Sequence, residues 1–206
     1  MTLTISEIVS NICSEGKFAG YPTTYIKLQG CNLYCSYCNH KNTKRKRMSV
    51  QSIMHYIFKM GNEHIIITGG EPLLQETIFV LVYDLVDRGY QVMIETNGSL
   101  QLEDTLYKRS YCYSLAIKCP SSGMGNKNNY KNLGKLIAHD EVKFIIKDIE
   151  DYMFAKDIIK SYKTKANIVF IPLITEKNIA RQLSQWLLED KIPRARLCLN
   201  QNLNCQ

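Results

Sequence analysis

The sequence lacks any long apolar run. Its most apolar stretches, such as TIFVLVYDLV (77–86), contain a charged residue well before the roughly 18 residues that a membrane span requires. The amino-terminal MTLTISEIVSNICSEG also lacks the basic start, the continuous apolar core and the small-residue cleavage site of a secretory signal. These absences predict a cytoplasmic protein without a membrane span.

Internal repeats and low-complexity linkers are missing as well. A length of 206 residues suits one domain and leaves little room for a second. The 45% apolar and 22% charged residues are typical of a globular soluble protein. We therefore expect a single domain over residues 1–206.

Disulfide bonds are not the expected use of the eight cysteines, because three of them fall within residues 31–38 and are too local to cross-link a chain of this size. A reducing compartment and metal ligation are the better interpretation. The other five are most simply reduced packing residues: Cys13, Cys112, Cys119, Cys198 and Cys205.

Positive charge is concentrated in one short run. The net charge is +7, and the lysines and arginines of residues 41–47 supply five of it, which leaves +2 for the rest of the chain. Such a run attracts an anionic substrate or an RNA backbone. A solvated loop without a partner is the alternative interpretation.

Six segments are rich in β-branched or aromatic residues and are predicted to be strands. They are 23–29, 64–68, 91–96, 112–118, 141–146 and 167–173. Four segments with apolar residues three and four apart are predicted to be helices: 49–60, with Ser49 as N-cap, 75–89, 151–163 and 176–190. Alternating strands and helices predict parallel β/α units, too few to close an eight-stranded barrel. We expect an open partial barrel or a curved parallel sheet.

Chemically suggestive residues follow the predicted strands. The three cysteines come after the first strand, GGEP after the second, TNG after the third and CPSSG after the fourth. The carboxyl ends of parallel strands lie on one side of a sheet, where such folds place their functional loops. The sequence therefore predicts one site built from these four loops.

The cysteines are spaced C-x3-C-x2-C in GCNLYCSYCNH (30–40), which permits two kinds of metal site. With His40 as fourth ligand, Cys31, Cys35 and Cys38 would form a zinc site. A four-iron cluster ordinarily takes four cysteines, so three would leave one iron open for another ligand.

The segment TGGEPLLQ (68–75) offers two glycines that allow close backbone approach, and Glu71, whose carboxylate could accept hydrogen bonds from an ammonium group. Alternatively the glycines only turn the chain, and Glu71 caps Leu74 or Gln75.

The combination of C-x3-C-x2-C with GGEP resembles the radical S-adenosylmethionine (SAM) superfamily. Within it, SEGKFAGYPTTYIKLQGCNLYCSYC, ITGGEPLLQ, ETNGS and KCPSSGMGNKN are similar to the 7-carboxy-7-deazaguanine synthase family. The likeness runs from about Ser14 to Asn128 and continues loosely to the carboxyl end. It implies an α/β fold, a partial (βα)6-type TIM barrel with an open, curved parallel sheet.

By this resemblance, Cys31, Cys35 and Cys38 ligate a 4Fe-4S cluster whose open iron chelates SAM. The implied SAM contacts are Tyr37, Cys38, Asn39, Gly70, Glu71, Glu95, Lys118, Cys119, Pro120 and Ser121. The implied substrate contacts are Ile12, Cys13, Ser14, Glu15, Lys27, Thr68, Asn200, Gln201 and Asn202, with residues 194–206 closing the pocket. The resemblance implies that a deoxyadenosyl radical starts ring contraction of 6-carboxy-5,6,7,8-tetrahydropterin, with loss of ammonia and regeneration of SAM.

Several positions depart from the family pattern. Lys27 replaces the usual arginine, which exchanges a bidentate carboxylate clamp for a point charge, although a lysine at a strand edge would look the same. Asn39-His40 replaces Asp-Thr, whose hydroxyl-bearing residue binds magnesium in the family, so a requirement for Mg²⁺ is doubtful. His40 then hydrogen-bonds substrate, binds a softer metal or is a plain loop residue.

Two further departures concern the SAM and substrate sites. Ala116 stands where related enzymes often have a polar residue near SAM, and LCLNQNLNCQ replaces the usual Gln-x-His-Lys ending. These departures leave open a diverged homologue that acts on a related pterin, or a paralogue that has lost its activity.

The resemblance also implies partners. We expect a pterin as substrate, an external one-electron donor of the flavodoxin or ferredoxin type, and a homodimer. Competing hypotheses are an activase that generates a glycyl radical on a partner protein, and a zinc-stabilised RNA-binding module that uses the three cysteines, His40 and the basic run.

Overall fold

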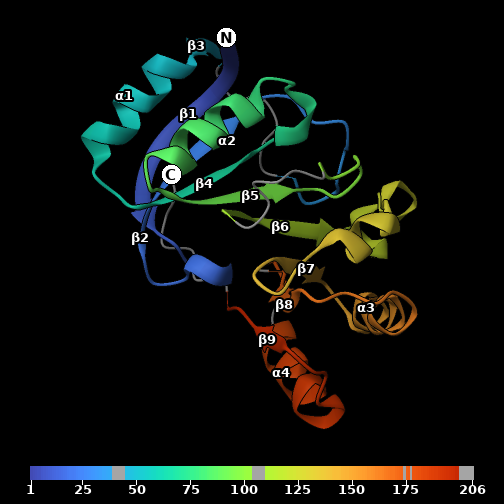
Figure 1. Ribbon diagram of the computed structural model, residues 1–206. Helices are drawn as coiled ribbons and strands as arrows, with labels where there is room; N and C mark the ends of the chain where they lie inside the picture. Colours follow the sequence, from blue (N-terminus) through green and yellow to red (C-terminus); the bar gives the residue numbers. More distant parts are fainter. Residues whose placement is uncertain (39–44, 104–109, 174, 177, 200–206) are drawn as a thin grey trace.

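The computed structural model describes residues 1–38, 45–103, 110–173, 175–176 and 178–199. These residues form one sheet in the order β3-β1-β2-β4-β5-β6-β7-β8-β9, which curves but does not close (Figure 1). The strands are β1 (Thr2–Ile12), β2 (Pro22–Leu28), β3 (Lys46–Ser49), β4 (His64–Gly69), β5 (Gln91–Thr96), β6 (Tyr111–Ile117), β7 (Glu141–Ile146), β8 (Asn167–Pro172) and β9 (Ala195–Leu197).

The parallel part of the sheet confirms the predicted α/β class. Strands β2 and β4 to β9 pair in parallel, each with the next in the sheet. The six predicted strands correspond to β2 and β4 to β8, and no bound differs by more than one residue. The open, curved parallel sheet is therefore confirmed.

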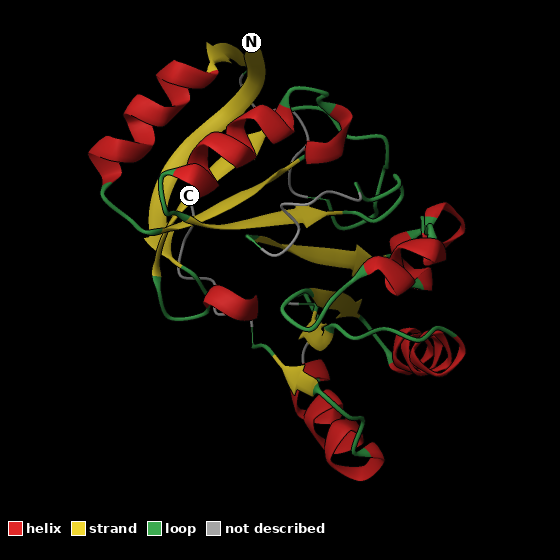
Figure 2. Ribbon diagram, viewed as in Figure 1, coloured by secondary structure: helices red, strands yellow, loops and turns green. Residues whose placement is uncertain are grey.

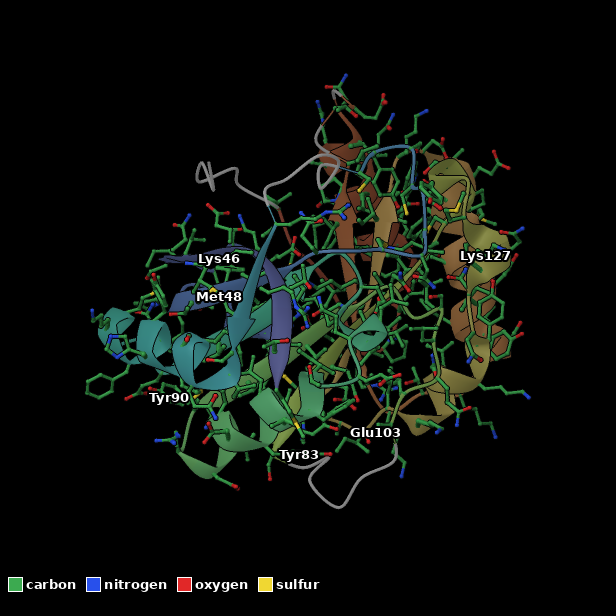
Figure 3. The ribbon with its side chains drawn as sticks, turned by 90° about the horizontal axis from the view of Figure 1, so that it is seen from above. Lys46, Met48, Tyr83, Tyr90, Glu103 and Lys127 are labelled. Carbon is green, nitrogen blue, oxygen red and sulfur yellow. The ribbon has the colours of Figure 1, made fainter. Side chains whose placement is uncertain are left out.

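The antiparallel edge was not predicted. Strand β1 pairs antiparallel with both β2 and β3, and β3 contains the end of the basic run. Lys46 and Arg47 are thus strand residues and not part of a loop, and Arg47 donates to Thr2 Oγ1 at 3.1 Å. Figure 3 shows Lys46 and Met48 together on this strand, where Met48 is 7% exposed and joins the core.

Four α-helices are described: α1 (Val50–Met60), α2 (Ile78–Asp87), α3 (Ile149–Ser161) and α4 (Ile179–Asp190) (Figure 2). Ser49 caps α1 as predicted, accepting a hydrogen bond from Ser52 N at 3.1 Å. Helix α2 begins at Ile78, three residues after the predicted start at Gln75. Pro72–Leu74, just before the predicted start, form a separate 3-10 turn, η2. Helix α3 begins two residues early, since Asp148 caps it.

No helix was predicted between β6 and β7, and the described chain has no α-helix there. The chain there forms three 3-10 segments, η4 (Pro120–Ser122), η5 (Gly125–Lys127) and η6 (Tyr130–Lys135). Glycines and a proline keep the segment irregular, and Gly123 takes a φ of +72° where η4 ends. The predicted site loop thus lies in irregular structure.

The two faces of the sheet are covered differently. The outer face packs on the α-helices, and in Figure 1 α1 and α2 cover one part of the sheet while α3 and α4 lie beside the other. The inner face is filled at its amino-terminal end by the hairpin between β1 and β2, which contains the 3-10 turn η1 (Gly16–Phe18). Cys13 and Phe18 of this hairpin pack on Ile66, Met93 and Cys112. We call these five residues the plug.

Among the residues that the structure describes, no helix has the length and apolar character needed to cross a membrane.

Replacing Phe170 with alanine should destabilise the fold strongly. Phe170 has no exposed surface and contacts the Phe144 and Tyr152 rings, both at 5.7 Å between centroids. Removing a buried phenylalanine costs about 3–5 kcal/mol. Urea denaturation of Phe170→Ala should show this loss, whereas Phe58→Ala, at a side chain that is 77% exposed, should change the free energy of unfolding little. Equal losses of unfolding free energy in the two variants would contradict the assignment of Phe170 to the core between the sheet and the helices.

Candidate active site

Polar side chains occupy the inner face between the plug and the carboxyl ends of the strands. Residues paired in neighbouring parallel strands point to the same face. The pairs Lys27 with Thr68, Glu95 with Ser114, Ser114 with Glu141, and Ala116 with Lys143 therefore share the inner face. Five strands contribute to this polar layer.

Lys143 lies at the centre of a buried ion network. Its side chain is 6% exposed, and Nζ lies 2.8 Å from Glu15 Oε1, donates to Glu95 Oε1 and lies 4.0 Å from Glu141 Oε1. Thr68 Oγ1 donates to the other oxygen of Glu95 at 2.7 Å. These contacts bring Glu15, Glu95 and Thr68 into one cluster.

Burial alone would lower the pKa of Lys143, but the carboxylates of Glu15, Glu95 and Glu141 raise it well above its ordinary value. A lysine with a raised pKa in the folded state adds stability at every pH below its ordinary pKa. This contribution is lost only as the pH rises through the raised value. Lys143 is therefore a fixed cation at neutral pH.

Glu141 extends this network toward the last strand. Its Oε1 accepts from Ser114 Oγ at 2.8 Å, and Arg196 Nη2 donates to its Oε2 at 2.8 Å. Lys27 belongs to a separate pair, with Nζ 2.8 Å from Glu7 Oε2. The Lys27 side chain is 17% exposed and that of Glu7 41%, so this pair faces solvent more than the Lys143 network does.

The loop after β6 holds the middle of the cysteine segment. Ser36 N donates to Ser122 O at 3.1 Å, and Ser36 Oγ donates to Ser121 O at 2.8 Å. Ser121 in turn donates its N–H to Asp151 Oδ1 of α3 at 3.0 Å. A continuous set of hydrogen bonds thus connects α3, the CPSSG loop and the cysteines.

The loop after β5 holds the beginning of the cysteine segment. Asn97 Nδ2 donates to Asn32 Oδ1 at 3.0 Å, and Asn32 Nδ2 donates to Ser99 Oγ at 2.9 Å. The TNG segment therefore contacts the residue that follows Cys31 directly.

Gly70 allows the loop after β4 to approach the same segment. A Cβ atom at this position would lie 1.9 Å from the carbonyl oxygen of Gly30, so only glycine fits. Glu71 N then donates to Gly30 O at 2.8 Å. The close approach predicted for the GGEP glycines is to the backbone just before Cys31.

The three thiols differ in exposure. Cys31 is exposed, Cys35 is 9% exposed and Cys38 is half-buried. Burial raises the pKa of the Cys35 thiol, and its neighbours Cys31 and Cys38 raise it further, whereas the cation of Lys118 opposes the change. The thiols lie near one another and near a positive charge.

No group of three histidine, cysteine or acidic side chains within the described ranges is arranged to hold one metal ion. Zinc requires its ligands to meet at a single ion. The thiolates of an iron–sulfur cluster bind different irons and need not meet. Among the described residues, the three thiols therefore do not converge on one ion position.

Comparisons with known proteins agree with this arrangement. A model of the radical SAM superfamily matches residues 25–108. The 7-carboxy-7-deazaguanine synthase of Methanospirillum hungatei JF-1 is 37% identical over 192 residues, covering 92% of this chain and 80% of the relative. The chain belongs to the 7-carboxy-7-deazaguanine synthase family. The synthase of Koribacter versatilis is also similar, at 32% identity, with 91% of this chain and 90% of the relative covered.

Solved structures share the fold of this family member. The crystal structure of QueE from Escherichia coli superimposes with a TM-score of 0.79 at 21% identity, covering 95% of this chain and 92% of the other. Streptococcus suis SuiB bound to S-adenosylmethionine gives 0.58 at 17% identity, covering 86% of this chain and 45% of the other.

Most of the residues predicted to contact SAM lie in the cysteine segment or in the loops that hold it, and two acidic ones, Glu71 and Glu95, have partners within the protein. The Glu71 carboxylate is fully buried and accepts hydrogen bonds from Leu73 N, Thr96 Oγ1 and Asn97 N. It caps η2 through Leu73 N, which is close to the capping role named as the alternative for this residue. Glu95 lies in the Lys143 network, among the residues predicted for substrate.

The other predicted SAM residues form parts of the same loops. Tyr37 is largely buried, which raises the pKa of its hydroxyl. Lys118 is held through its backbone, with Asn128 Oδ1 2.8 Å from its N–H. Cys119 has no exposed surface, and burial raises its pKa, whereas Pro120 is exposed. Asn39 lies outside the described residues.

The predicted substrate residues are grouped only in part. Glu15 and Thr68 share the Lys143 network, and Lys27 is paired with Glu7 beside it. Cys13 belongs to the plug, and Ile12, 41% exposed, ends β1. Ser14 lies between Cys13 of the plug and Glu15 of the network in the sequence. Outside the described residues lie His40, Asn200, Gln201 and Asn202.

Sequence reasoning missed Lys143, Glu141, Asn97 and Asp151. Lys143 in EVKFII looks like a lysine at a strand edge, and its partner Glu15 is 128 positions away. The alternation of the strand nevertheless places Lys143 on the same face as Glu141. The shared face of Glu141 and Lys143 was the signal in the sequence that could have indicated a polar site on this strand.

Replacing Lys143 with methionine should destabilise this family member strongly, because three carboxylates would lose their buried cation. Breaking a buried ion pair costs about 3–5 kcal/mol. Lys27→Met is the matched control, since the exposed partner Glu7 limits its loss to about 1 kcal/mol. Chemical denaturation at pH 7 compares the two variants, and equal losses would refute the central role of Lys143.

Proposed function

We propose that the protein is a radical SAM lyase that converts 6-carboxy-5,6,7,8-tetrahydropterin into 7-carboxy-7-deazaguanine and ammonia. One observation carries the proposal. The loops after β4, β5 and β6 all form hydrogen bonds with the segment that contains Cys31, Cys35 and Cys38, beside the polar inner face. The family supplies the reaction. The product and ammonia together contain all atoms of the substrate, so no net oxidant is needed.

The cysteine segment fits a 4Fe-4S cluster. Cys31 is exposed and its sulfur already accepts N–H donors, as a thiolate ligand would. Gly70 leaves space for the loop after β4 to reach this segment. When bound, the cluster and SAM supply the radical chemistry, while the protein orients the substrate and excludes water.

The inner-face network is suited to bind the pterin. Glu15 and Glu95 present carboxylate oxygens, which accept hydrogen bonds from the amino and ring N–H groups of a pterin. Lys143 holds both carboxylates in place. Lys27 is the cation proposed to face the substrate carboxylate, with Glu7 as its partner before substrate binds.

The resemblance also suggests an external electron donor of the flavodoxin or ferredoxin type, and a homodimer. Both remain sequence-based predictions.

Anaerobic turnover with 6-carboxytetrahydropterin, SAM and a reductant should yield a product with the mass of 7-carboxy-7-deazaguanine. Cys35→Ala should abolish SAM cleavage and product formation while the fold is retained. Cys112→Ala is the matched control, because that thiol belongs to the plug and lies outside the cysteine segment. Mass spectrometry measures both reactions. Deoxyadenosine formation by Cys35→Ala would refute the cluster assignment.

Magnesium should matter less than in the family generally, because the position of the usual hydroxyl ligand holds His40. In metal-depleted buffer the enzyme should keep more than about half of its rate, whereas His40→Thr should become dependent on added Mg²⁺. A strict requirement in the unaltered protein would show that His40 has not replaced the ion.

A further inference from the structure

The sulfur of Cys31 accepts hydrogen bonds from two N–H groups. One donor is the backbone N–H of Leu33, 3.4 Å away within the cysteine segment. The other is Asn97 Nδ2, 3.6 Å away, from the loop after β5. The second donor is a side chain from another loop, so it can be changed without altering the cysteine segment.

The orientation of the Asn97 amide is fixed by its neighbours. Ser99 N lies 3.0 Å from Asn97 Oδ1, and a backbone N–H can only donate. Ser99 Oγ adds a second hydrogen bond to this oxygen at 2.6 Å. The NH₂ group must therefore face Cys31 and Asn32 Oδ1, and an exchange of oxygen and nitrogen would lose these contacts.

The backbone of Asn97 is equally constrained. Its N–H donates to Glu71 Oε2 at 2.6 Å, and Glu71 is fully buried. The other oxygen of Glu71 accepts from Thr96 Oγ1 at 2.8 Å and from Leu73 N at 3.0 Å. Asn97 itself is only 8% exposed. The N–H donor is thus held in place by contacts within the protein itself.

We propose that Asn97 raises the reduction potential of the cluster through its hydrogen bond to Cys31 Sγ. This inference rests on the proposed function, in which Cys31 is a cluster ligand. Reduction by one electron from an external donor adds negative charge to the cluster and its thiolates. An N–H···S hydrogen bond stabilises that charge, so it favours the reduced form more than the oxidised form.

Two variants separate this electrostatic role from structure. Asn97→Ala removes the donor. Asn97→Asp keeps an oxygen for Ser99 but replaces the NH₂ group with a negatively charged oxygen beside the sulfur. Asn32→Ala is the matched control, because it removes the contact between Asn32 and Asn97 and leaves the donor to Cys31 in place.

The measurement is a potentiometric titration of the anaerobically reconstituted full chain with dithionite, followed by electron paramagnetic resonance. At a fixed potential, Asn97→Ala should have a ratio of reduced to oxidised cluster about three- to tenfold lower than the unaltered protein, or roughly 30–60 mV more negative for a one-electron couple. Asn97→Asp should shift further in the same direction. Asn32→Ala should change the ratio by less than about twofold.

Iron and sulfide contents separate the possible failures. Unshifted potentials in both variants at full cluster content would overturn the role of Asn97 and leave the proposed function intact. Loss of the cluster in both variants would also overturn it, because Asn97 would then be needed for assembly. An unaltered protein that binds no cluster would instead refute the proposed function.

Discussion

The ammonium group of Lys143 lies among the carboxylates of Glu15, Glu95 and Glu141, and through them it connects parts of the sheet that are not neighbours. Glu15 belongs to the hairpin after β1, whereas Lys143 is on β7, and β2, β4, β5 and β6 lie between them in the sheet. An open sheet has no strand pairing to join its two ends. The ion network supplies a connection across the inner face, and it positions the same carboxylates that are proposed to bind substrate.

The cysteine segment depends on a different kind of contact. Its backbone and its small polar side chains bond to loops from β4, β5 and β6, with Glu71 and Asp151 as buried acceptors behind those loops. These bonds join residues far apart in the sequence, and each contributes a modest free energy. Their common effect is that the position of the cysteine segment depends on all three loops.

The parallel strands could be predicted because β-branched runs such as HIIIT are buried on both faces and resemble few other structures. Strand β1 was missed although its first half, TLTIS, alternates polar and apolar residues as a half-buried strand does. The cysteine and glycine motifs located the loops. The partners of Lys143 and Asn97 could not be predicted, because they are far apart in sequence and each pairing depends on how the sheet curves. Glu71 caps the turn that follows it, the alternative role that the sequence left open, although through Leu73 N and not through Leu74 or Gln75.

The plug limits where a molecule can reach the inner face of the sheet. Cys13 and Phe18 fill the amino-terminal end of the inner face against Ile66, Met93 and Cys112. Among the described residues, the plug thus fills one end of the inner face, and the exposed Cys31 lies at the other end, after β2. Under the proposed function, substrate and SAM would then reach the polar inner face from the same end of the sheet, so that SAM bound first would stand in the path of the pterin.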